Sequence, residues 1–571
     1  MKRIYWRYLI FVVFFFSIPV LTQGGERVLQ VKVTDQQSFN NITKIINRGI
    51  AEGYTDIRVD FAKNVYFFNN AQFYIINKQA PDVSLTINGN NAIFRPKGSV
   101  LKGKGSKVKY KPGCTYLDLK GNDIYFYSKT YQADSSVEIL DEKAKQCRLY
   151  CSELKGVTVK DCTNATVDIT TWYTRMNCRV QKIGDGFVYF IADNLEPGMG
   201  NYGDYNVNYD YTVGKKYPRF RLSNVNIGGC PFYSDGEFLV SDLEIEAYQC
   251  EESHLLQIMH SSFNKVEIKG MIIQGNTSAC PLIMFNDTKV NSINVSKCEF
   301  SSVRALNIWG KNTDNITVSD CYFHDNYTIV LLFENDCANV KIINNRFERI
   351  AYLTNSFCIK VRGTNYLVSH NVLSDFGYGG IGVGNSYMNV VDTIPSYGIV
   401  ERNNVFHTQE FRNNKQSWTL IDGGAIYIYT CNNGAVIRYN YVHDICGMGA
   451  VRGIYCDDGT TNCSVYGNIV MNIESSYGID LRKSLVLDNL GLGKSNVNNK
   501  ITDNYFNNKF RFEGRGDDST SVKGRNYIVV EKGKEAPDMD TASLVETESD
   551  RIVHFTTRKI ERKAKRMLRK K

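Results

Sequence analysis

A short apolar pattern recurs through the second half of the chain, and this repeat constrains the fold more than any other feature. Each copy reads apolar, any, apolar, any, any, ladder residue, any, apolar. The spacing varies from 23 residues (298 to 321) to 36 residues (404 to 440). Repeats of this length are typical of stacked architectures. The ladder positions are Leu243, Met271, Cys298, Cys321, Asn345, Asn371, Asn404, Asn440, Asn468 and Asn504.

Alternating apolar residues predict a strand that buries one face. One short strand cannot form a core alone, whereas stacked copies can. A column of Asn residues that bond to one another would mark one turn of such a stack. With about three short strands per coil, the repeat predicts an all-β fold, a right-handed parallel β-helix. A leucine-rich repeat would need a Leu-rich consensus, and a propeller would need longer antiparallel blades.

A second short strand recurs once per coil, independently of the first, and supports the same fold. Its apolar pairs flank one outward residue. The copies lie at residues 283–285, 306–308, 359–361, 381–383, 426–428, 454–456 and 479–481.

The repeat divides the chain into five predicted parts. Residues 1–24 are a signal peptide, residues 25–99 hold the N-terminal cap and the first coils, residues 100–215 a β-rich insertion, residues 216–510 the β-helix, and residues 511–571 a polar linker with a basic tail. In the cap, Asp35 or Ser38 begins a helix that carries Phe39, Ile42, Ile46 and Ile50 on one stripe and covers the open end of the solenoid.

Residues 1–24 have the pattern of a secretory signal peptide. Lys2, Arg3 and Arg7 precede an apolar run from position 9 to position 21, which is too short to span a bilayer comfortably. We therefore expect a secreted or periplasmic protein. Most of the 16 cysteines fall at core positions and predict small buried residues, but one or two disulfides remain open among Cys114, Cys147, Cys151, Cys162 and Cys178.

The net charge of +9 is concentrated at the two ends of the chain. Residues 1–24 contribute +3 and residues 558–571 contribute +8, so the body has a formal charge of −2. This argues against a basic nucleic-acid surface, and no nucleic-acid partner is expected. The tail allows a helix with Ile560, Ala564, Met567 and Leu568 roughly on one face. It is either a solvated tail or a contact for an acidic surface.

Stacking places equivalent residues of the second strand about 4.8 Å apart, so its outward residues form continuous rows. The inner row reads Asn307, Lys360, Gly382, Tyr427, Tyr455, Asp480, and the row beyond it reads Trp309, Arg362, Gly384, Tyr429, Asp457, Arg482. Aromatic rings beside charged groups are typical of sugar sites. Long insertions at 385–398, 407–424 and 446–452 could wall such a site. The predicted substrate-binding residues are Tyr427, Tyr429, Tyr455, Arg482, Lys360, Arg362 and Trp309.

Asp457 and Asp480 fall one rung apart and two residues along, which gives roughly 8 Å between their Cβ atoms. This lies in the window of about 6.5–9.5 Å for inverting glycoside hydrolysis. Arg482 beside Asp457 would make that carboxylate the base, and Asp480 the acid. Asp422 and Asp458 are further catalytic candidates, although each also fits an Asp-Gly turn.

The dipeptide at 443–444 looks catalytic, but His324 and Asp325 hold the same place after their ladder residue. A structural role in the turn after the ladder residue explains both His-Asp dipeptides. No metal site is predicted, because no Cys-x-x-Cys pair exists.

With these residues in place, the chain resembles the pectate-lyase-like superfamily of right-handed parallel β-helix proteins. Within it, residues 423–427, 440–444 and 453–459 look most like secreted bacterial β-helix glycoside hydrolases. The resemblance implies that carboxylates projecting from successive coils do the acid–base work. The matching residues are Asp422, Asp457, Asp458 and Asp480.

The sequence therefore predicts an exported, monomeric enzyme that hydrolyses glycosidic bonds in a poly- or oligosaccharide without a cofactor. A polysaccharide lyase acting on a uronic-acid glycan is the first alternative. It would use Ca²⁺ or a cation together with a base from the set Lys360, Arg362, Arg482 and Lys483. A glycan-binding protein or adhesin without catalysis is the second alternative.

Overall fold

The computed structural model describes most of the chain. The described residues are 20–21, 27–68, 72–78, 80–96, 108–110, 117–120, 123–126, 131–135, 137–141, 143–157, 159, 162, 165–170, 175–192, 219–223, 226–227, 230–231, 236–238, 254–276, 281–303, 306–326, 329–334, 336–350, 357–384, 396–408, 423–429, 432–445, 451–457, 460–473, 477–481, 498–508, 510–513, 521–530, 539–542, 545–546, 549–554 and 556–569.

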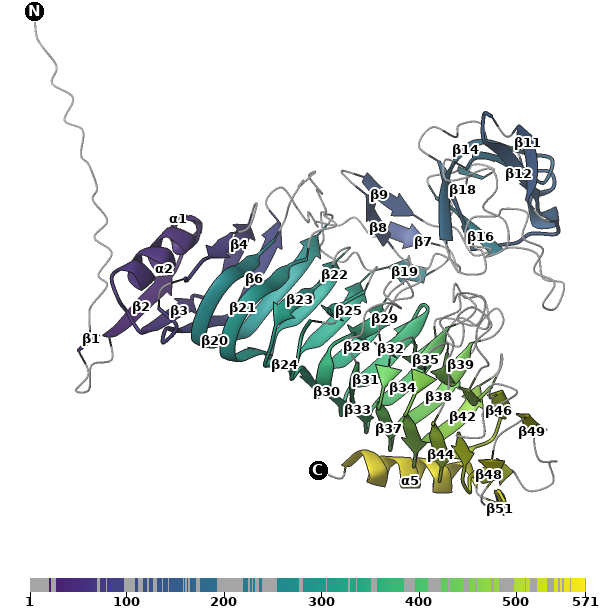
Figure 1. Ribbon diagram of the computed structural model, residues 1–571. Helices are drawn as coiled ribbons and strands as arrows, with labels where there is room; N and C mark the ends of the chain where they lie inside the picture. Colours follow the sequence, from purple (N-terminus) through teal and green to yellow (C-terminus); the bar gives the residue numbers. More distant parts are fainter. Residues whose placement is uncertain are drawn as a thin grey trace, which may run out of the picture.

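The chain winds as a right-handed parallel β-helix, and each coil gives one strand to each of three parallel sheets (Figure 1). We name them sheets A, B and C in the order in which a coil passes through them. Strands pair with the equivalent strands of the coils before and after, as β26 does with β23 and β29. The fold predicted from the repeat is confirmed.

The strands fall into these sheets as follows. Sheet A contains β5 (Phe73–Ile75), β23 (Ile308–Thr313), β26 (Leu331–Phe333), β29 (Phe357–Val361), β32 (Gly379–Val383), β35 (Gly424–Ile428), β39 (Arg452–Cys456), β43 (Ile479–Leu481), β46 (Phe510–Glu513) and β49 (Met539–Ala542). Sheet B contains β2 (Arg27–Val33), β3 (Asp56–Phe61), β24 (Ile316–Ser319), β27 (Lys341–Ile343), β30 (Thr364–Ser369), β33 (Tyr397–Glu401), β37 (Val436–Arg438), β41 (Ser464–Tyr466), β44 (Lys500–Thr502), β47 (Val522–Lys523) and β50 (Val545–Glu546). Sheet C contains β4 (Val65–Phe68), β22 (Glu299–Val303), β25 (Tyr322–Asn326), β28 (Arg346–Ile350), β31 (Val372–Phe376), β34 (Asn404–Thr408), β38 (Tyr441–Ile445), β42 (Ile469–Ile473), β45 (Tyr505–Phe506), β48 (Tyr527–Val530) and β51 (Arg551–His554).

Three long strands cross the corners between sheets. β6 (Ser84–Pro96) runs through sheets B and C, β20 (Leu256–Asn276) through all three, and β21 (Ile283–Ser296) through A and B. A short fourth pairing joins β36 (Asn432–Asn433) to β40 (Thr460–Thr461).

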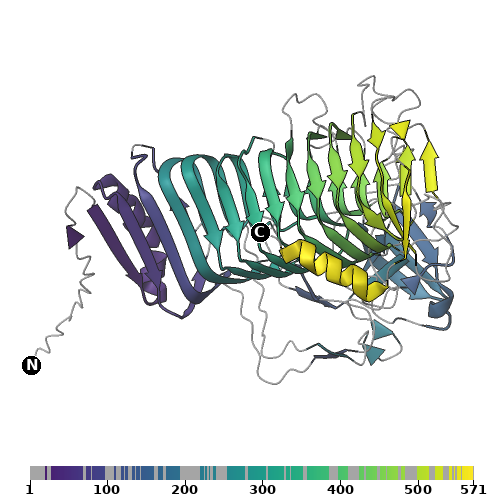
Figure 2. The ribbon, with the colours of Figure 1, turned by 90° about the horizontal axis from the view of Figure 1, so that it is seen from below.

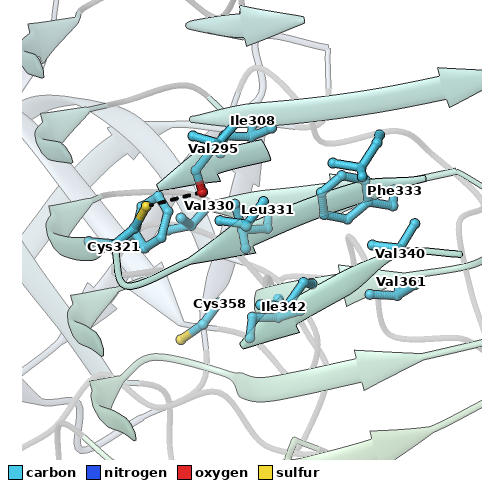
Figure 3. Close-up of a cluster of buried hydrophobic side chains, with 14 of the residues drawn as sticks. Val295, Ile308, Cys321, Val330, Leu331, Phe333, Val340, Ile342, Cys358 and Val361 are labelled. Carbon is cyan, nitrogen blue, oxygen red and sulfur yellow. Dashed lines mark hydrogen bonds between the residues drawn. The ribbon is translucent and has the colours of Figure 1, made fainter. Parts of the chain in front are cut away.

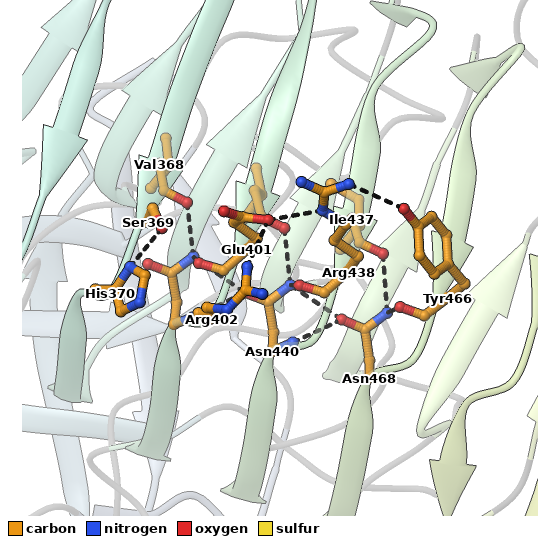
Figure 4. Close-up of polar contacts among 12 residues, drawn as sticks. Val368, Ser369, His370, Glu401, Arg402, Ile437, Arg438, Asn440, Tyr466 and Asn468 are labelled. Atoms are coloured by element: carbon orange, nitrogen blue, oxygen red, sulfur yellow. Dashed lines mark hydrogen bonds and ion pairs between the residues drawn. The ribbon is translucent and has the colours of Figure 1, made fainter. Parts of the chain in front are cut away.

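The corner between sheets B and C is closed by the asparagine ladder (Figure 4). Asn440 donates from Nδ2 to the Val400 carbonyl at 2.9 Å and to Oδ1 of Asn468 at 3.0 Å. The same Oδ1 accepts the backbone N–H of Asn440 at 3.0 Å. Each buried amide therefore satisfies groups in two neighbouring coils, which an apolar residue could not do. The ladder runs through Asn345, Asn371, Asn403, Asn440, Asn468, Asn504 and Asn526.

The ladder differs from the prediction at one rung, where Asn403 takes the place predicted for Asn404. Asn403 donates to Asn440, whereas Asn404 begins β34. The misalignment arises because Gly398 stands where other copies have an apolar side chain. A Cβ at Gly398 would lie 2.4 Å from the Tyr366 ring, so that ring fills the space instead.

The residue before each ladder position from Cys298 to Asn504 turns the corner in the left-handed conformation, with φ between 53° and 67°. Most of these are not glycine, so the backbone is held in a conformation that costs of order 1 kcal/mol or more per residue. The ladder bonds offset that cost. These residues are Lys297, Asp320, Asn344, His370, Arg402, Tyr439, Gly467 and Asp503.

The inward residues of all three sheets form one continuous apolar core (Figure 3). Phe300, Phe323 and Phe347 stack along the axis with ring centroids 4.9 Å apart. Cys321 replaces an amide at its ladder position and donates from Sγ to the Val295 carbonyl at 3.7 Å. The prediction of buried cysteines is confirmed at Cys298, Cys321, Cys358, Cys456 and Cys463.

The predicted N-terminal cap is present as two helices, α1 (Gln36–Asn40) and α2 (Ile42–Ala51). Asp35 caps the first by accepting the Ser38 N–H at 2.7 Å. Phe39, Ile42 and Ile46 are fully buried in the solenoid core. The predicted signal peptide lies outside the described residues except for β1 (Val20–Leu21).

The chain leaves the solenoid after β6 and returns at β20. In between, a seven-stranded antiparallel sheet has its own core, separate from the solenoid. Its strands are β10 (Tyr131–Gln132), β11 (Glu138–Asp141), β12 (Gln146–Tyr150), β13 (Thr166–Thr170), β14 (Arg175–Gly184), β15 (Phe187–Ile191) and β16 (Arg219–Ser223), with the 3-10 turn η1 (Ser152–Leu154). Three short antiparallel pairings accompany it: β7 (Val108–Tyr110) with β19 (Gly236–Phe238), β8 (Leu117–Lys120) with β9 (Asp123–Phe126), and β17 (Asn226–Ile227) with β18 (Cys230–Pro231).

The β-rich insertion extends beyond the range of 100–215 expected from the sequence. Phe238, which the repeat assigned to the solenoid, pairs antiparallel with Val108. Pro96 lies above Phe68, and Leu256 lies above Phe73. The excursion thus takes the place of the connection between Phe68 and Phe73 in the coil below.

The solenoid also continues past residue 510, where the repeat was expected to stop. β46 to β51 keep the parallel register of the three sheets as far as His554. Asn526 and Asp550 extend the ladder, with the Asn526 N–H bonded to Asp550 Oδ1 at 3.0 Å. The copies were missed because the apolar residues that mark them are few.

The basic tail forms helix α5 (Thr557–Arg569), which lies along the flank of the solenoid (Figure 2). Ile560 and Ala564 are buried against Ile469 of sheet C and Val529. A helix with an apolar face is as predicted, and its docking rules out the solvated tail. No helix in the described part of the chain is long and apolar enough to cross a membrane.

Candidate functional site

The outer face of sheet A carries the residues singled out from the sequence. On each strand two side chains enter the core and the residue between them points outward, as Tyr427 does between Ile426 and Ile428. Pairing aligns Tyr427 with Tyr455, and Tyr455 with Asp480. The central row is therefore Trp309, Leu332, Lys360, Gly382, Tyr427, Tyr455 and Asp480.

An edge row is formed by the residue that follows the second inward residue of each strand. The Asp457 N–H bonds to the Ile428 carbonyl at 2.8 Å, and the Tyr429 N–H bonds to the Val383 carbonyl at 3.1 Å. These bonds continue the parallel register, so Asp457 and Tyr429 are neighbours on adjacent rungs. The row reads Glu334, Arg362, Gly384, Tyr429 and Asp457.

The predicted rows are wrong for Trp309 and for Asn307. The prediction paired Trp309 with Arg362, but Trp309 aligns through Leu332 with Lys360. Asn307, expected to point outward, is completely buried. The alignment slipped by two residues because alternation cannot distinguish 306–308 from 308–310, and because the coil at 331–333 was missed.

A third outward row was not predicted at all. Two consecutive residues point inward where the chain enters sheet A, for example Cys358 and Ile359. Strict alternation is therefore broken, and Phe357 joins the outer aromatic cluster. The register of this row is Phe357, Gly379, Gly424 and Arg452.

Five rings form an aromatic cluster outside the core: Phe357, Tyr378, Tyr427, Tyr429 and Tyr455. Phe357 and Tyr429 are parallel, with an interplanar angle of 8° and centroids 6.1 Å apart. Gly379 leaves the space that the Phe357 ring fills, because a Cβ there would lie 2.3 Å from that ring. The phenol oxygen of Tyr429 is buried and has no hydrogen-bond partner within the described residues.

Asp457 lies at the edge of this cluster with 4% of its surface exposed. The Tyr427 hydroxyl donates to its Oδ2 at 2.5 Å. This hydrogen bond fixes the positions of both the carboxyl group and the ring. Thr460 donates from its hydroxyl to the Asp457 carbonyl at 2.7 Å, which holds the backbone where the strand ends.

Asp480 is fully buried and pairs with a buried arginine. Arg452 donates from Nε to Asp480 Oδ2 at 2.8 Å. The guanidinium also lies over the Tyr455 ring, with Cζ 3.9 Å from the centroid. Arg452 is thus a functional candidate that sequence reasoning missed, because strict alternation placed it in the core.

The two carboxylates are diagonal neighbours, as predicted. Cys456 pairs with Leu481, so Asp457 and Asp480 are one rung and two residues apart. Strand spacing gives roughly 8 Å between their Cβ atoms. The described contacts add two partners that were not expected: the Arg452 guanidinium binds Asp480, and the Tyr427 phenol binds Asp457. Asp422, Asp458 and Arg482 lie outside the described residues.

The cations on sheet A are of two kinds. Arg362 donates to Glu334 at 2.7 Å, and Glu334 also accepts the Trp309 indole N–H at 3.3 Å, so these three form one network. Lys360 instead lies over the rings of Tyr429 (5.4 Å) and Phe357 (5.8 Å). Glu334 is a second residue that the sequence did not single out.

The dipeptide at 443–444 lies elsewhere, on sheet C. His443 stacks on Tyr441 at 4.0 Å, and His324 stacks on Tyr322 at 4.3 Å in an earlier coil. The two histidines thus share one local arrangement. Among the described residues, no group of three or more His, Cys, Asp or Glu side chains is placed to hold a metal ion.

Comparison with known proteins adds likeness of fold only. No protein-family model and no curated protein matches the chain. A solved structure described as a glycoside hydrolase is 11% identical with a TM-score of 0.40, and the match covers 93% of this chain and 98% of the other. The A-module of an Azotobacter vinelandii mannuronan C-5 epimerase is 13% identical with a TM-score of 0.35, over 54% and 79% of the two chains.

A phage tailspike is a third similar structure. It comes from Acinetobacter baumannii bacteriophage AP22, in complex with A. baumannii capsular saccharide, and is 9% identical with a TM-score of 0.26, over 89% and 76% of the two chains. At these values the likenesses carry no argument about activity. The function must be inferred from the site itself.

Proposed function

We propose that the protein is an exported carbohydrate-active enzyme that hydrolyses glycosidic bonds with Asp457 and Asp480. One observation carries the proposal. Two buried carboxylates project from adjacent rungs of the outer face of sheet A, each with its own side-chain donor, beside a cluster of five rings. Glycoside hydrolysis uses a carboxylate pair at this spacing, together with rings that stack on sugar faces.

The contacts suggest which carboxylate does which task. Asp480 accepts a hydrogen bond from the Arg452 guanidinium, so it is assigned as the base that takes a proton from water. Asp457, bonded to a neutral phenol, is assigned as the acid. This reverses the roles expected from the sequence, where Arg482 was to hold Asp457 ionised.

In the proposed reaction, Asp457 gives its proton to the glycosidic oxygen as the bond from that oxygen to the anomeric carbon breaks. Water attacks the anomeric carbon from the opposite side and loses its proton to Asp480. The products are a hemiacetal and an alcohol. A separation of roughly 8 Å leaves room for the water and predicts inversion of the anomeric configuration.

The binding role goes to the rings and cations around the pair. Tyr429 offers a hydroxyl that has no hydrogen-bond partner among the described residues, and Lys360 holds an ammonium group over the Tyr429 and Phe357 rings. The rings of Tyr427 and Tyr455 contact each other and lie between these groups and the two carboxylates. Trp309, Leu332 and Arg362 extend the same face toward earlier coils.

The test is digestion of a panel of poly- and oligosaccharides, with products read by mass spectrometry and anomeric configuration by NMR. Wild type should release saturated, inverted products. Asp457→Asn and Asp480→Asn should each lower kcat by at least about a hundredfold, the usual size of a general acid or base contribution. Asp287→Asn, an exposed aspartate of an earlier coil, is the control and should leave kcat unchanged.

A polysaccharide lyase is the second candidate, favoured by Lys360 and Tyr429. Their ammonium group and phenol lie together and could neutralise a uronate and take its C5 proton. Arg362 is already paired with Glu334, and Arg482 and Lys483 lie outside the described residues. Unsaturated products that absorb in the ultraviolet would establish elimination in place of hydrolysis. Binding of a glycan without any product would favour an adhesin.

A further inference from the structure

A second groove lies away from sheet A, between helix α5 and the corner that joins sheets B and C. It encloses about 840 Å³. Its floor is made of corner residues of successive coils and the first residues of sheet C. Its wall is one side of the helix. The lining residues are Arg402, Tyr439, Gly467, Asp503, Tyr505, Tyr527, Lys559, Arg562, Lys563, Arg566 and Met567.

The groove is strongly positive. Arg402, Lys559, Arg562, Lys563 and Arg566 line it, and Asp503 is the single carboxylate among the lining residues, so the lining has a formal charge of +4. Within the described residues, neither Arg562 nor Arg566 forms an ion pair. Arg402 is ion-paired with Glu401 at 2.9 Å, so the charge that attracts an anionic ligand comes mainly from the helix residues.

Aromatic faces lie among these cations. Tyr505 and Tyr527 stack with centroids 4.4 Å apart and an interplanar angle of 8°. Lys563 lies 3.7 Å above the Tyr505 ring, and Arg402 lies 5.2 Å above the Tyr439 ring. Coils repeat about every 4.8 Å, so a ligand along the axis meets a new corner at each rung.

The Tyr439 ring packs directly against Gly467 in the floor of the groove. A Cβ at Gly467 would lie 2.6 Å from that ring, so the ring can lie there only because residue 467 has no side chain.

The helix is not arranged to bind a membrane. Its apolar residues Ile560 and Ala564 are already buried against Ile469 and Val529. An interfacial helix needs that face free to enter lipid. What remains toward the groove is cationic and aromatic.

We propose that this groove binds an anionic polysaccharide through its carboxylate, sulfate or phosphate groups. The choice of a sugar polymer over another polyanion rests on the proposed function, and the position of the groove makes it a binding site separate from the reaction. It would hold an acidic glycan along the solenoid while sheet A acts on the chain. Arg562 and Arg566 are its main anion-binding residues, and Tyr505 and Tyr527 form part of its floor.

The test is binding to the full-length protein, measured by calorimetry at several salt concentrations. Polygalacturonate oligomers are the anionic probe, and the same oligomers with their carboxyl groups reduced are the neutral control. We expect binding of the anionic oligomers alone, weakening with salt as ion pairs are screened. Arg562→Gln with Arg566→Gln should weaken it about tenfold, or 1.4 kcal/mol.

A matched variant shows whether position or total charge matters. Arg558→Gln with Arg569→Gln removes the same charge from exposed sites of the same helix that do not line the groove. It should change the affinity less than twofold. Equal losses in both double variants, with unchanged thermal unfolding, would overturn the groove as the site. So would affinity for the reduced oligomers equal to that for the anionic ones.

Other polyanions and the enzyme variant complete the test. A single-stranded oligonucleotide of equal charge, or vesicles containing anionic lipid, should bind at least tenfold more weakly. Tighter binding of either would overturn the assignment to a glycan. Asp457→Asn should bind the anionic oligomers as wild type does, so a failed reaction and a failed groove are told apart. Loss of groove binding with hydrolysis intact would overturn this inference alone.

Discussion

At the scale of single residues, Tyr427 combines a ring in the aromatic cluster with a hydrogen bond to Asp457. Substitution of Tyr427 can test the hydrogen bond separately from the ring packing. A buried carboxylate that loses its donor is less well positioned and less well solvated. The ring, in contrast, keeps its contacts with Tyr455 when only the hydroxyl is removed.

Tyr427→Phe should therefore lower kcat/KM by about tenfold or more while destabilising the protein by no more than about 1–3 kcal/mol. Steady-state kinetics and denaturant unfolding measure the two effects. Tyr441→Phe, on sheet C, is the matched control and should leave kcat/KM unchanged. Full activity in Tyr427→Phe would show that the hydrogen bond has no part in the reaction.

Substitutions in the ion pair of Arg452 with Asp480 test its contribution to stability separately from its contribution to catalysis. Arg452→Met should destabilise the fold by about 3–5 kcal/mol, because it removes the guanidinium from a buried carboxylate. Arg452→Met with Asp480→Leu replaces the pair by apolar groups and should recover most of that loss. The double variant should nevertheless be inactive. A stable double variant with wild-type activity would remove Asp480 from the mechanism.

The sequence allowed the diagonal placement of Asp457 and Asp480 to be predicted, because alternation within a strand and stacking between coils are regular there. Arg452 and Phe357 could not be found in the same way. Two successive residues point inward where the chain enters sheet A, and this shifts the alternation of the residues before them. That shift depends on the corner, which the pattern of a single strand does not encode.

At the scale of elements, the ladder determines how one coil sits on the next. Asn440 makes side-chain bonds to Val400 and Asn468, and its Oδ1 accepts from the backbone and side chain of Asn403. All of these groups are buried. Removing the amide leaves donors and acceptors of three coils unsatisfied, each of which costs about 1–3 kcal/mol.

Asn440→Ala should accordingly destabilise the protein by several kcal/mol, of order 3–6. Asn291→Ala removes an exposed amide that bonds to Asn264 and should cost less than about 0.5 kcal/mol. Urea unfolding of both variants measures the difference. Equal, small effects would mean that apolar packing alone holds the coils in register.

Some elements could be predicted from the apolar repeat and others could not. Cys321 was recognised as a ladder member because the apolar residues around it keep their spacing. Asn403 was missed because Gly398 replaces an apolar residue and Tyr366 fills its space from the neighbouring coil. Helix α5 was predicted from its apolar face, but the surface that binds it depends on Ile469 and Val529, which no local pattern connects to it.

At the scale of the whole molecule, the solenoid and the antiparallel insertion have separate cores. The insertion begins after Pro96 and ends before Leu255, which is buried in the solenoid core. Pro96 and Leu256 lie directly above Phe68 and Phe73. A short connection like the one in the coil below would therefore close the gap. The solenoid core does not need the insertion.

Replacing residues 97–254 by the sequence of residues 69–71 keeps the buried Leu255 and should leave a folded solenoid. Its thermal unfolding midpoint should lie within about 5 °C of that of the full-length protein, since few contacts of the solenoid core are lost. Circular dichroism and limited proteolysis measure this. A variant that is insoluble or molten would show that the insertion is part of the solenoid's stability.

The most direct test of the central claim is a crystal structure of Asp457→Asn soaked with the longest oligosaccharide that wild type cleaves. The account predicts an ordered sugar chain across the outer face of sheet A, with rings against Tyr429 and Phe357 and the scissile bond between residue 457 and Asp480. An oligosaccharide ordered only on another face, with sheet A empty, would contradict it.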